Sequence, residues 1–180
     1  MTRYVAFLRG INVSGKNRIP MKELRECCEK LGYTEVVTYL NSGNVMFSAE
    51  EGNGQKCVDD IRDMIKEGFE LDVPVFVIRQ DALREALAAA PRWWGTDDKE
   101  IYDNLIFVMP PADADWICGR VGQPTEGLEQ ISVHGDRIIY WSFDRKRYVK
   151  ANWWKSTASR GIGEFLTIRT ANTLKKAAEL

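Results

Sequence analysis

The sequence predicts an α+β protein made of two halves, each with the element order of a ferredoxin-like subdomain. Three observations lead to this class. The chain has 180 residues, of which 44% are apolar, which is enough for a core without disulfide staples. Apolar periodicity in the first half alternates between strand and helix in the order β-α-β-β-α-β, and most of that order returns in the second half.

The elements of the first half follow from apolar spacing and turn residues. A helix begins at Pro20 and stops at Gly32, because apolar residues recur in it at helical spacing. Asn41-Ser42-Gly43 separates two β-rich runs and predicts a hairpin turn. The predicted strands are 5–8, 35–40, 44–48 and 73–78, and the second helix covers 58–69.

The second half begins after a linking segment, with a helix over 81–90 and a loop over 92–98. A strand is expected at 105–109, a helix at 111–121, and a hairpin from 128–133 and 138–142, followed by helices. We therefore divide the chain into a ferredoxin-like subdomain (1–80), a linking helix and loop (81–103), and a second α+β subdomain with C-terminal helices (104–180).

The composition argues against a membrane protein. No apolar run approaches the roughly 18 residues that span a bilayer, and the first apolar stretch is interrupted by Arg9. The four cysteines form no CxxC pair and are expected to be reduced thiols. These features predict a cytoplasmic protein with no membrane partner.

Charge is unevenly distributed although the net charge is only -1. Residues 136–180 hold ten Lys and Arg against four Asp and Glu, and residues 1–20 hold four basic residues and no acid. Basic ends permit an anionic partner, although solvated charged faces are the more common cause of such asymmetry.

The first loop contains the most suggestive motif. Gly10 to Lys16 matches the G-x-x-x-x-G-K part of a phosphate-binding loop, but the required Ser or Thr is missing and Pro20 would disrupt a helix begun at Lys16. A true NTPase loop is therefore not expected. Arg9, Lys16 and Arg18 still form a basic cluster on a glycine-containing loop whose amides could face an anion.

Nucleophilic and metal chemistry find little support. The single histidine, His134, lies beside the predicted turn at Gly135-Asp136, without a G-x-S-x-G elbow, and is expected to be exposed. A group of carboxylates, interpreted as a solvated acidic loop, has no spacing that selects hydrolysis or metal binding. Its members are Asp97, Asp98, Glu100 and Asp103.

The segment from Tyr140 to Lys155 interleaves aromatic and basic residues, a composition found on single-stranded nucleic-acid surfaces. The alternative is that its rings at Tyr140, Tyr148, Trp153 and Trp154 face the core. Near the end of the chain, Thr170 is a candidate helix cap with Arg169 beside it, a geometry that suits an anion or a plain salt bridge.

The chain resembles the bacterial family called domain of unknown function 1697. The resemblance rests on Tyr4 to Val13, Gly15-Lys16-Asn17, Ile19-Pro20-Met21, Thr38 to Val45, and the ending Thr167 to Thr173. One branch of that family has Asn-Trp where Thr170-Ala171 stand here. The resemblance implies a ferredoxin-like architecture and implies no activity, catalytic residue or cofactor.

The leading expectation is a protein that binds an anionic ligand, either a nucleotide or a single-stranded nucleic acid. The alternatives are a protein-interaction or structural module and a small-molecule transferase or hydrolase. Catalytic residues, enzymatic activity and oligomeric state are left open, and no cofactor or metal is expected. The candidate ligand-binding residues are Arg9, Asn12, Lys16, Asn41, Ser42, Asn44, Arg169, Asn172 and Thr173. We expect any site to form where the first loop meets the last helix.

Overall fold

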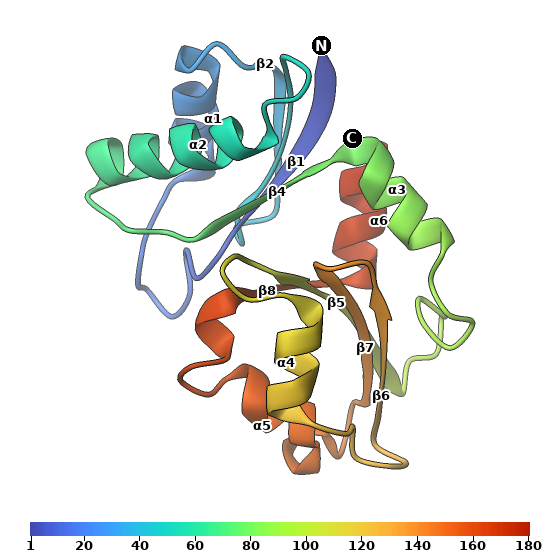
Figure 1. Cartoon of the computed structure of the whole chain (residues 1–180). Helices are drawn as coiled ribbons and strands as arrows, with labels where there is room; N and C mark the ends of the chain where they lie inside the picture. Colours follow the sequence, from blue (N-terminus) through green and yellow to red (C-terminus); the bar gives the residue numbers. More distant parts are fainter. The chain divides into compact units, whose positions relative to one another are not determined.

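Two four-stranded antiparallel sheets organise the chain, one in each of two units (Figure 1). The computed structural model describes all 180 residues. The first unit comprises Met1–Glu85 with Lys176–Leu180, and the second comprises Ala86–Lys175. No helix is both long and apolar enough to cross a membrane.

The first unit has the predicted β-α-β-β-α-β order. Its elements are β1 (Thr2–Leu8), α1 (Met21–Lys30), β2 (Thr34–Tyr39), β3 (Asn44–Ala49), α2 (Gly54–Phe69) and β4 (Val75–Arg79). The strands lie in the order β2-β3-β1-β4, so β1 pairs with both β3 and β4. Ala6 is opposite Val45 on one side and Val77 on the other. This sheet order, with two crossover helices, is that of a ferredoxin-like subdomain.

Both helices of the first unit cover the same face of its sheet (Figure 1). Apolar residues at helical spacing explain why: Leu24 and Cys28 of α1 are buried, as are Ile61 and Ile65 of α2. They pack on the inward-facing residues of the strands. The strand residues in this core include Tyr4, Ala6, Leu8, Val45 and Phe47.

The second unit repeats the topology. Its elements are β5 (Ile101–Val108), α4 (Ala114–Val121), β6 (Glu129–His134), β7 (Ile138–Asp144), the short helices η1 (Tyr148–Lys150), α5 (Asn152–Thr157) and η2 (Gly163–Phe165), and β8 (Leu166–Thr170). The sheet order is β6-β7-β5-β8. Its core joins Ile106, Ile139, Trp141 and Leu166 to Ile117 of α4 and Trp153 of α5. The expectation of two similar α+β subdomains is confirmed.

Several element boundaries differ from those predicted, and two of them in the second unit have a clear local cause. The helix expected at 111–121 begins at Ala114, because Asp113 is extended and its side chain accepts a hydrogen bond from the Trp116 amide. The strand expected at 105–109 begins earlier, at Ile101, since the ladder with β7 continues to the Ile101–Asp144 pair.

The units also divide the chain differently from the ranges 1–80, 81–103 and 104–180. The linking helix is α3 (Gln80–Ala88), and the last helix is α6 (Ala171–Glu179). The final five residues group with the first unit. Hydrogen bonds within that unit explain this: Gln80 Nε2 donates to the Ala177 carbonyl and Arg84 Nε to the Ala178 carbonyl, both at 2.8 Å.

Candidate functional site

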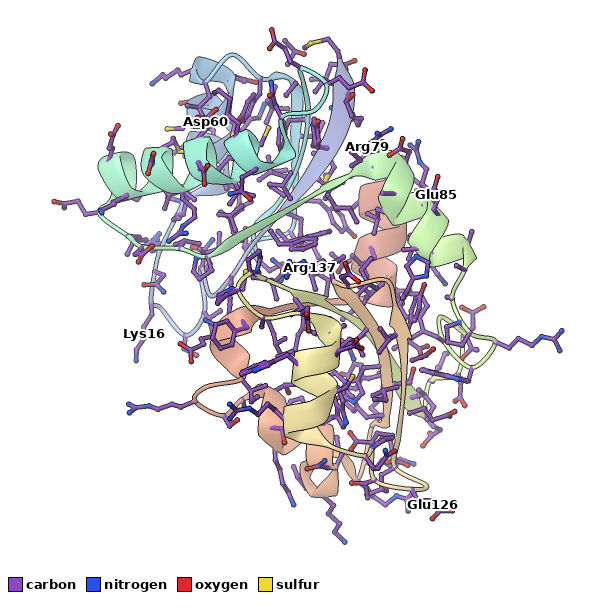
Figure 2. All side chains as sticks on the ribbon, in the orientation of Figure 1. Lys16, Asp60, Arg79, Glu85, Glu126 and Arg137 are labelled. Atoms are coloured by element: carbon purple, nitrogen blue, oxygen red, sulfur yellow. The ribbon has the colours of Figure 1, made fainter.

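The loop between β1 and α1 folds into a small hairpin. The Lys16 amide donates to the Val13 carbonyl at 2.9 Å, and the Asn12 amide to the Asn17 carbonyl at 3.1 Å. Ser14 and Gly15, at the centre of this turn, have φ values of 49° and 75°. Two consecutive positive φ values are typical of the tight type I′ turn. Lys16 is therefore held at the tip of the loop, where Figure 2 shows it.

Asn12 joins this loop to the β2–β3 turn. Its Oδ1 accepts from the Ile19 amide at 2.8 Å, and its Nδ2 donates to the carbonyls of Ile19 at 2.9 Å and Asn41 at 2.8 Å. The side chain thus pairs with Ile19 as a neighbouring strand would. Asn12 and Asn41, both candidate ligand-binding residues, are therefore in contact, but the side-chain amide of Asn12 is used in building the loop.

Asn44 and Ser42 build the hairpin turn. Asn44 is fully buried, and its Nδ2 donates to the Tyr39 carbonyl at 2.8 Å and to Ser42 Oγ at 3.1 Å. The next contact ties the turn to β1, where the Leu8 amide donates to the Gly43 carbonyl at 2.8 Å. A buried Asn at this position therefore positions the turn.

A pocket of about 400 Å³ opens beside this arrangement. It is lined by Asn12, Gly15, Lys16, Arg18, Ile19, Pro20, Met21 and Asn41. Lys16, Arg18 and Asn41 are exposed, and neither cation makes an ion pair. We call this the first-loop pocket.

The start of α1 also borders the first-loop pocket. No side chain caps this helix, and its first internal hydrogen bond runs from the Leu24 amide to the Pro20 carbonyl. Amides of the first turn therefore have no helical acceptor and carry the positive end of the helix dipole. One carboxylate, Glu23, belongs to the same turn but does not line the pocket.

Arg9 lies outside the pocket lining. Its amide donates to the Pro74 carbonyl at 2.9 Å, which ties the start of the loop to the segment before β4. Arg18, which lies two residues beyond Lys16, takes its place as the second pocket cation. Its presence in the basic loop cluster was the sequence signal for this position.

The remaining predicted residues, Arg169, Asn172 and Thr173, belong to the second unit. Arg169 is 9% exposed, and its Nη1 donates to Thr167 Oγ1 at 3.1 Å and to the Ile168 carbonyl at 2.9 Å. Burial lowers the pKa of Arg169 to about 10. Thr170 Oγ1 lies 3.0 Å from Thr173 Oγ1 at the start of α6.

Asn172 is exposed and lines a second pocket of about 420 Å³, together with Tyr102, Asp103 and Arg145. The first-loop residues and the residues near α6 are thus assigned to separate pockets in separate units. Their union in one site stays a prediction.

The acidic loop is smaller than expected. Asp103 lies in β5, is buried, and accepts a hydrogen bond from Ser142 Oγ on the opposite strand. His134 is half-buried at the end of β6 rather than exposed, with its ring 6.1 Å from that of Tyr140. No group of three or more His, Cys, Asp or Glu side chains is placed to hold a metal ion.

Most rings of the 140–155 segment face the core, because β7 is buried along both faces. Tyr140, Trp141 and Trp153 are at most 2% exposed. The two tryptophans are also hydrogen-bonded: Trp153 Nε1 donates to the Gly122 carbonyl at 3.0 Å, and Trp141 Nε1 to Glu129 Oε2 at 3.1 Å. Trp154 is the exception, with 39% of its surface exposed.

Comparison with known proteins supports the fold and names a family. A search of curated proteins finds no match. Among solved structures, the chain is similar to the conserved bacterial protein SP0830 from Streptococcus pneumoniae, with 26% identity and a TM-score of 0.83. The alignment covers 99% of this chain and 97% of the other. The family model described as "Protein of unknown function (DUF1697)" matches residues 1–140, so the chain belongs to that family.

Proposed function

We propose that the first-loop pocket binds the phosphate group of an anionic ligand, such as a nucleotide or the backbone of a nucleic acid. One observation carries this proposal: Lys16 and Arg18 line the same pocket, and neither forms an ion pair with a carboxylate. Two unpaired cations that border the same concave surface favour an anionic occupant, because each gains a charge-assisted hydrogen bond on binding.

The neighbouring groups add donors of the right kind. Amides at the start of α1 lack side-chain caps, and Asn41, an exposed residue with a side-chain amide, lines the pocket. The loop segment that carries Lys16 and Arg18 is held by the Asn12 side chain, which bonds to Ile19, and by the Val13–Lys16 turn. Donors that are already in place lose little freedom on binding, which favours affinity.

The remaining walls are apolar. Ile19, Pro20 and Met21 line the pocket, so part of a ligand can lie against carbon while its charged end meets Lys16 and Arg18. The pocket volume of about 400 Å³ is at the lower end of the range for small-molecule sites. This arrangement suits a phosphate with a compact organic group attached better than inorganic phosphate alone.

Calorimetric titration with inorganic phosphate, pyrophosphate, AMP and ADP at 50 and 300 mM KCl tests the proposal. Binding should weaken with salt, and Lys16→Ala and Arg18→Ala should each reduce affinity about tenfold, as expected for loss of a charge-assisted contact. Arg25→Ala is the matched control, because Arg25 lies on α1, is paired with Glu29 and does not line the pocket.

Two results would contradict the proposal. One is the absence of binding by all four probes at millimolar concentration. The other is a Lys16→Ala/Arg18→Ala double variant that binds as tightly as the unchanged protein.

A further inference from the structure

The second unit carries a separate aromatic and basic surface that the first-loop pocket does not involve. We define it by η1 and α5 and call it the Trp154 surface. Its members are Tyr148, Val149, Lys150, Trp154 and Lys155. Trp154 is 39% exposed and Val149 is 56% exposed, whereas the neighbouring Trp153 is fully buried.

Trp154 is held in place by other rings. Its ring centroid lies 4.5 Å from that of Tyr148 and 5.5 Å from that of Phe143, in edge-to-face geometry in both cases. The helix that carries it is anchored by Trp153, whose amide donates to Glu129 Oε1 at 3.0 Å. An exposed ring held in this way can stack on a planar ligand with little loss of rotational freedom.

The chain segment that carries this surface is strongly basic. Between Arg145 and Arg160 the chain has six Lys and Arg and no Asp or Glu. Arg147 pairs with Asp144 and Lys146 with Glu100, so two of the six are neutralised. Lys150, Lys155 and Arg160 make no ion pair. Arg145 makes none either, but it lies 3.9 Å from the Tyr102 ring and lines the second pocket with Asp97 and Asp98, so it does not belong to the Trp154 surface.

We infer that the Trp154 surface binds single-stranded nucleic acid, with a base stacked on Trp154 and phosphates near Lys150 and Lys155. Single-strand sites combine these two features, a stacking ring and unpaired cations that follow the backbone. The second pocket of the same unit is a poorer place for phosphate, because Asp97 and Asp98 line it beside Tyr102.

Two other anionic partners, a lipid surface and an acidic peptide, would make less use of the Trp154 ring. A lipid surface favours aromatic side chains that can enter the interface, whereas the Trp154 ring is held against Tyr148 and Phe143 and exposes 39% of its surface. An acidic peptide would be attracted by the lysines but would leave the ring without a planar partner. The ring therefore favours a nucleic acid base.

Fluorescence anisotropy of a labelled twelve-nucleotide oligo-dT measures the binding at 50 and 200 mM KCl. The affinity should fall with salt, as phosphate contacts require. Trp154→Ala should weaken binding about tenfold, and Trp154→Phe should restore most of it, because a stacking ring remains. Lys150→Ala/Lys155→Ala should weaken binding and reduce the salt dependence.

Trp116→Ala is the matched control. Trp116 lies on α4 of the same unit with similar exposure (36%) and with Arg120 4.9 Å from its ring, but Asp113 and Asp115 flank it. Its loss should leave oligo-dT affinity unchanged. Far-UV circular dichroism checks that each variant is folded. If Trp154→Ala does not fold, the Lys150→Ala/Lys155→Ala variant still tests the surface, because both lysines are exposed.

The inference is overturned if the unchanged protein does not bind oligo-dT at 100 µM and 50 mM KCl. Equal losses for Trp116→Ala and Trp154→Ala overturn it as well, as does tighter binding to poly-glutamate or to phosphatidylserine vesicles than to oligo-dT. Lys16→Ala/Arg18→Ala separates this inference from the proposed function, because adding Trp154→Ala to that variant should still weaken its remaining oligo-dT binding about tenfold. If it alone abolishes oligo-dT binding, the Trp154 surface is wrong and the first-loop pocket is the site.

Discussion

The side-chain amide of Asn12 donates to the main-chain carbonyl of Asn41 at 2.8 Å, and this bond joins the first loop to the β2–β3 turn. The same side chain makes both hydrogen bonds with the main chain of Ile19, a fully buried residue. One Asn thus positions two of the segments that border the first-loop pocket. Its role in the proposed site is structural support.

Asn12→Ala should lower the free energy of unfolding by about 2–3 kcal/mol, because buried main-chain groups of Ile19 lose their partners. Asn12 also has a positive φ of 53°, which Ala tolerates less well. Urea unfolding followed by circular dichroism measures the change. Asn17→Ala is the control: it has a similar φ of 50° and loses one exposed bond to Gly10, so its cost should be clearly smaller. Equal costs would contradict the role given to Asn12.

Gly43 cannot be replaced without moving β1 or the first loop. A Cβ at this position would lie 2.7 Å from Leu8 Cβ and 2.8 Å from Ile11 Cδ1, and the φ of Gly43 is +84°. Gly43→Ala should therefore destabilise the first unit by about 3 kcal/mol or more. Gly52→Ala shares the positive φ of +81° but meets nothing within 4 Å, so thermal unfolding should show a loss of only about 1 kcal/mol. A cost at Gly43 no larger than at Gly52 would show that the space can adapt.

Glu129 is a buried carboxylate that joins three parts of the second unit. It accepts hydrogen bonds from the Thr125 amide, the Trp153 amide and Trp141 Nε1, at 2.9, 3.0 and 3.1 Å. Glu129→Ala should lower the free energy of unfolding by about 3 kcal/mol or more, because charged hydrogen bonds are lost and their donors stay buried. Glu129→Gln should cost less, since it keeps an acceptor oxygen.

Glu126→Ala is the matched control for Glu129. Glu126 lies in the turn just before β6 and points to solvent (Figure 2), so its loss should change stability by less than about 0.5 kcal/mol. Tryptophan fluorescence during urea unfolding measures both variants. A Glu129→Ala variant as stable as Glu126→Ala would contradict the linking role.

Asp144 gives the second unit a pH-dependent contribution to stability. The Arg147 side chain and the amides of Arg147 and Lys146 lower the pKa of Asp144 from 3.8 to about 2. Because the folded-state pKa is depressed, this contribution is fully present above about pH 4 and is lost as pH falls toward 2. Asp144→Asn should therefore flatten the decline in stability between pH 4 and pH 2. An unchanged pH profile in thermal unfolding would show that Asp144 makes no such contribution.

Local sequence patterns predicted most of the helices and strands, because apolar spacing and turn residues involve only residues that are close together in the chain. The apolar spacing of α1 and α2, and the Asn41-Ser42-Gly43 turn, indicate the β-α-β-β-α-β order before any contact is known. Where the patterns were incomplete, a local bond decided the boundary, as at Asp113, which starts α4 three residues later than expected.

The sequence by itself determined that the chain has two similar halves and that basic and Asn residues gather in the first loop. Only the tertiary structure decided which of those residues line a pocket. The side chains of Asn12 and Asn44 donate hydrogen bonds to the main chain of Asn41 and Tyr39, whereas Lys16 and Arg18 line a pocket. Likewise, strand register buries Asp103 against Ser142 and turns most rings of 140–155 inward. The physical reason is that a polar side chain's partners come from segments far away in the chain, and sequence spacing does not encode them.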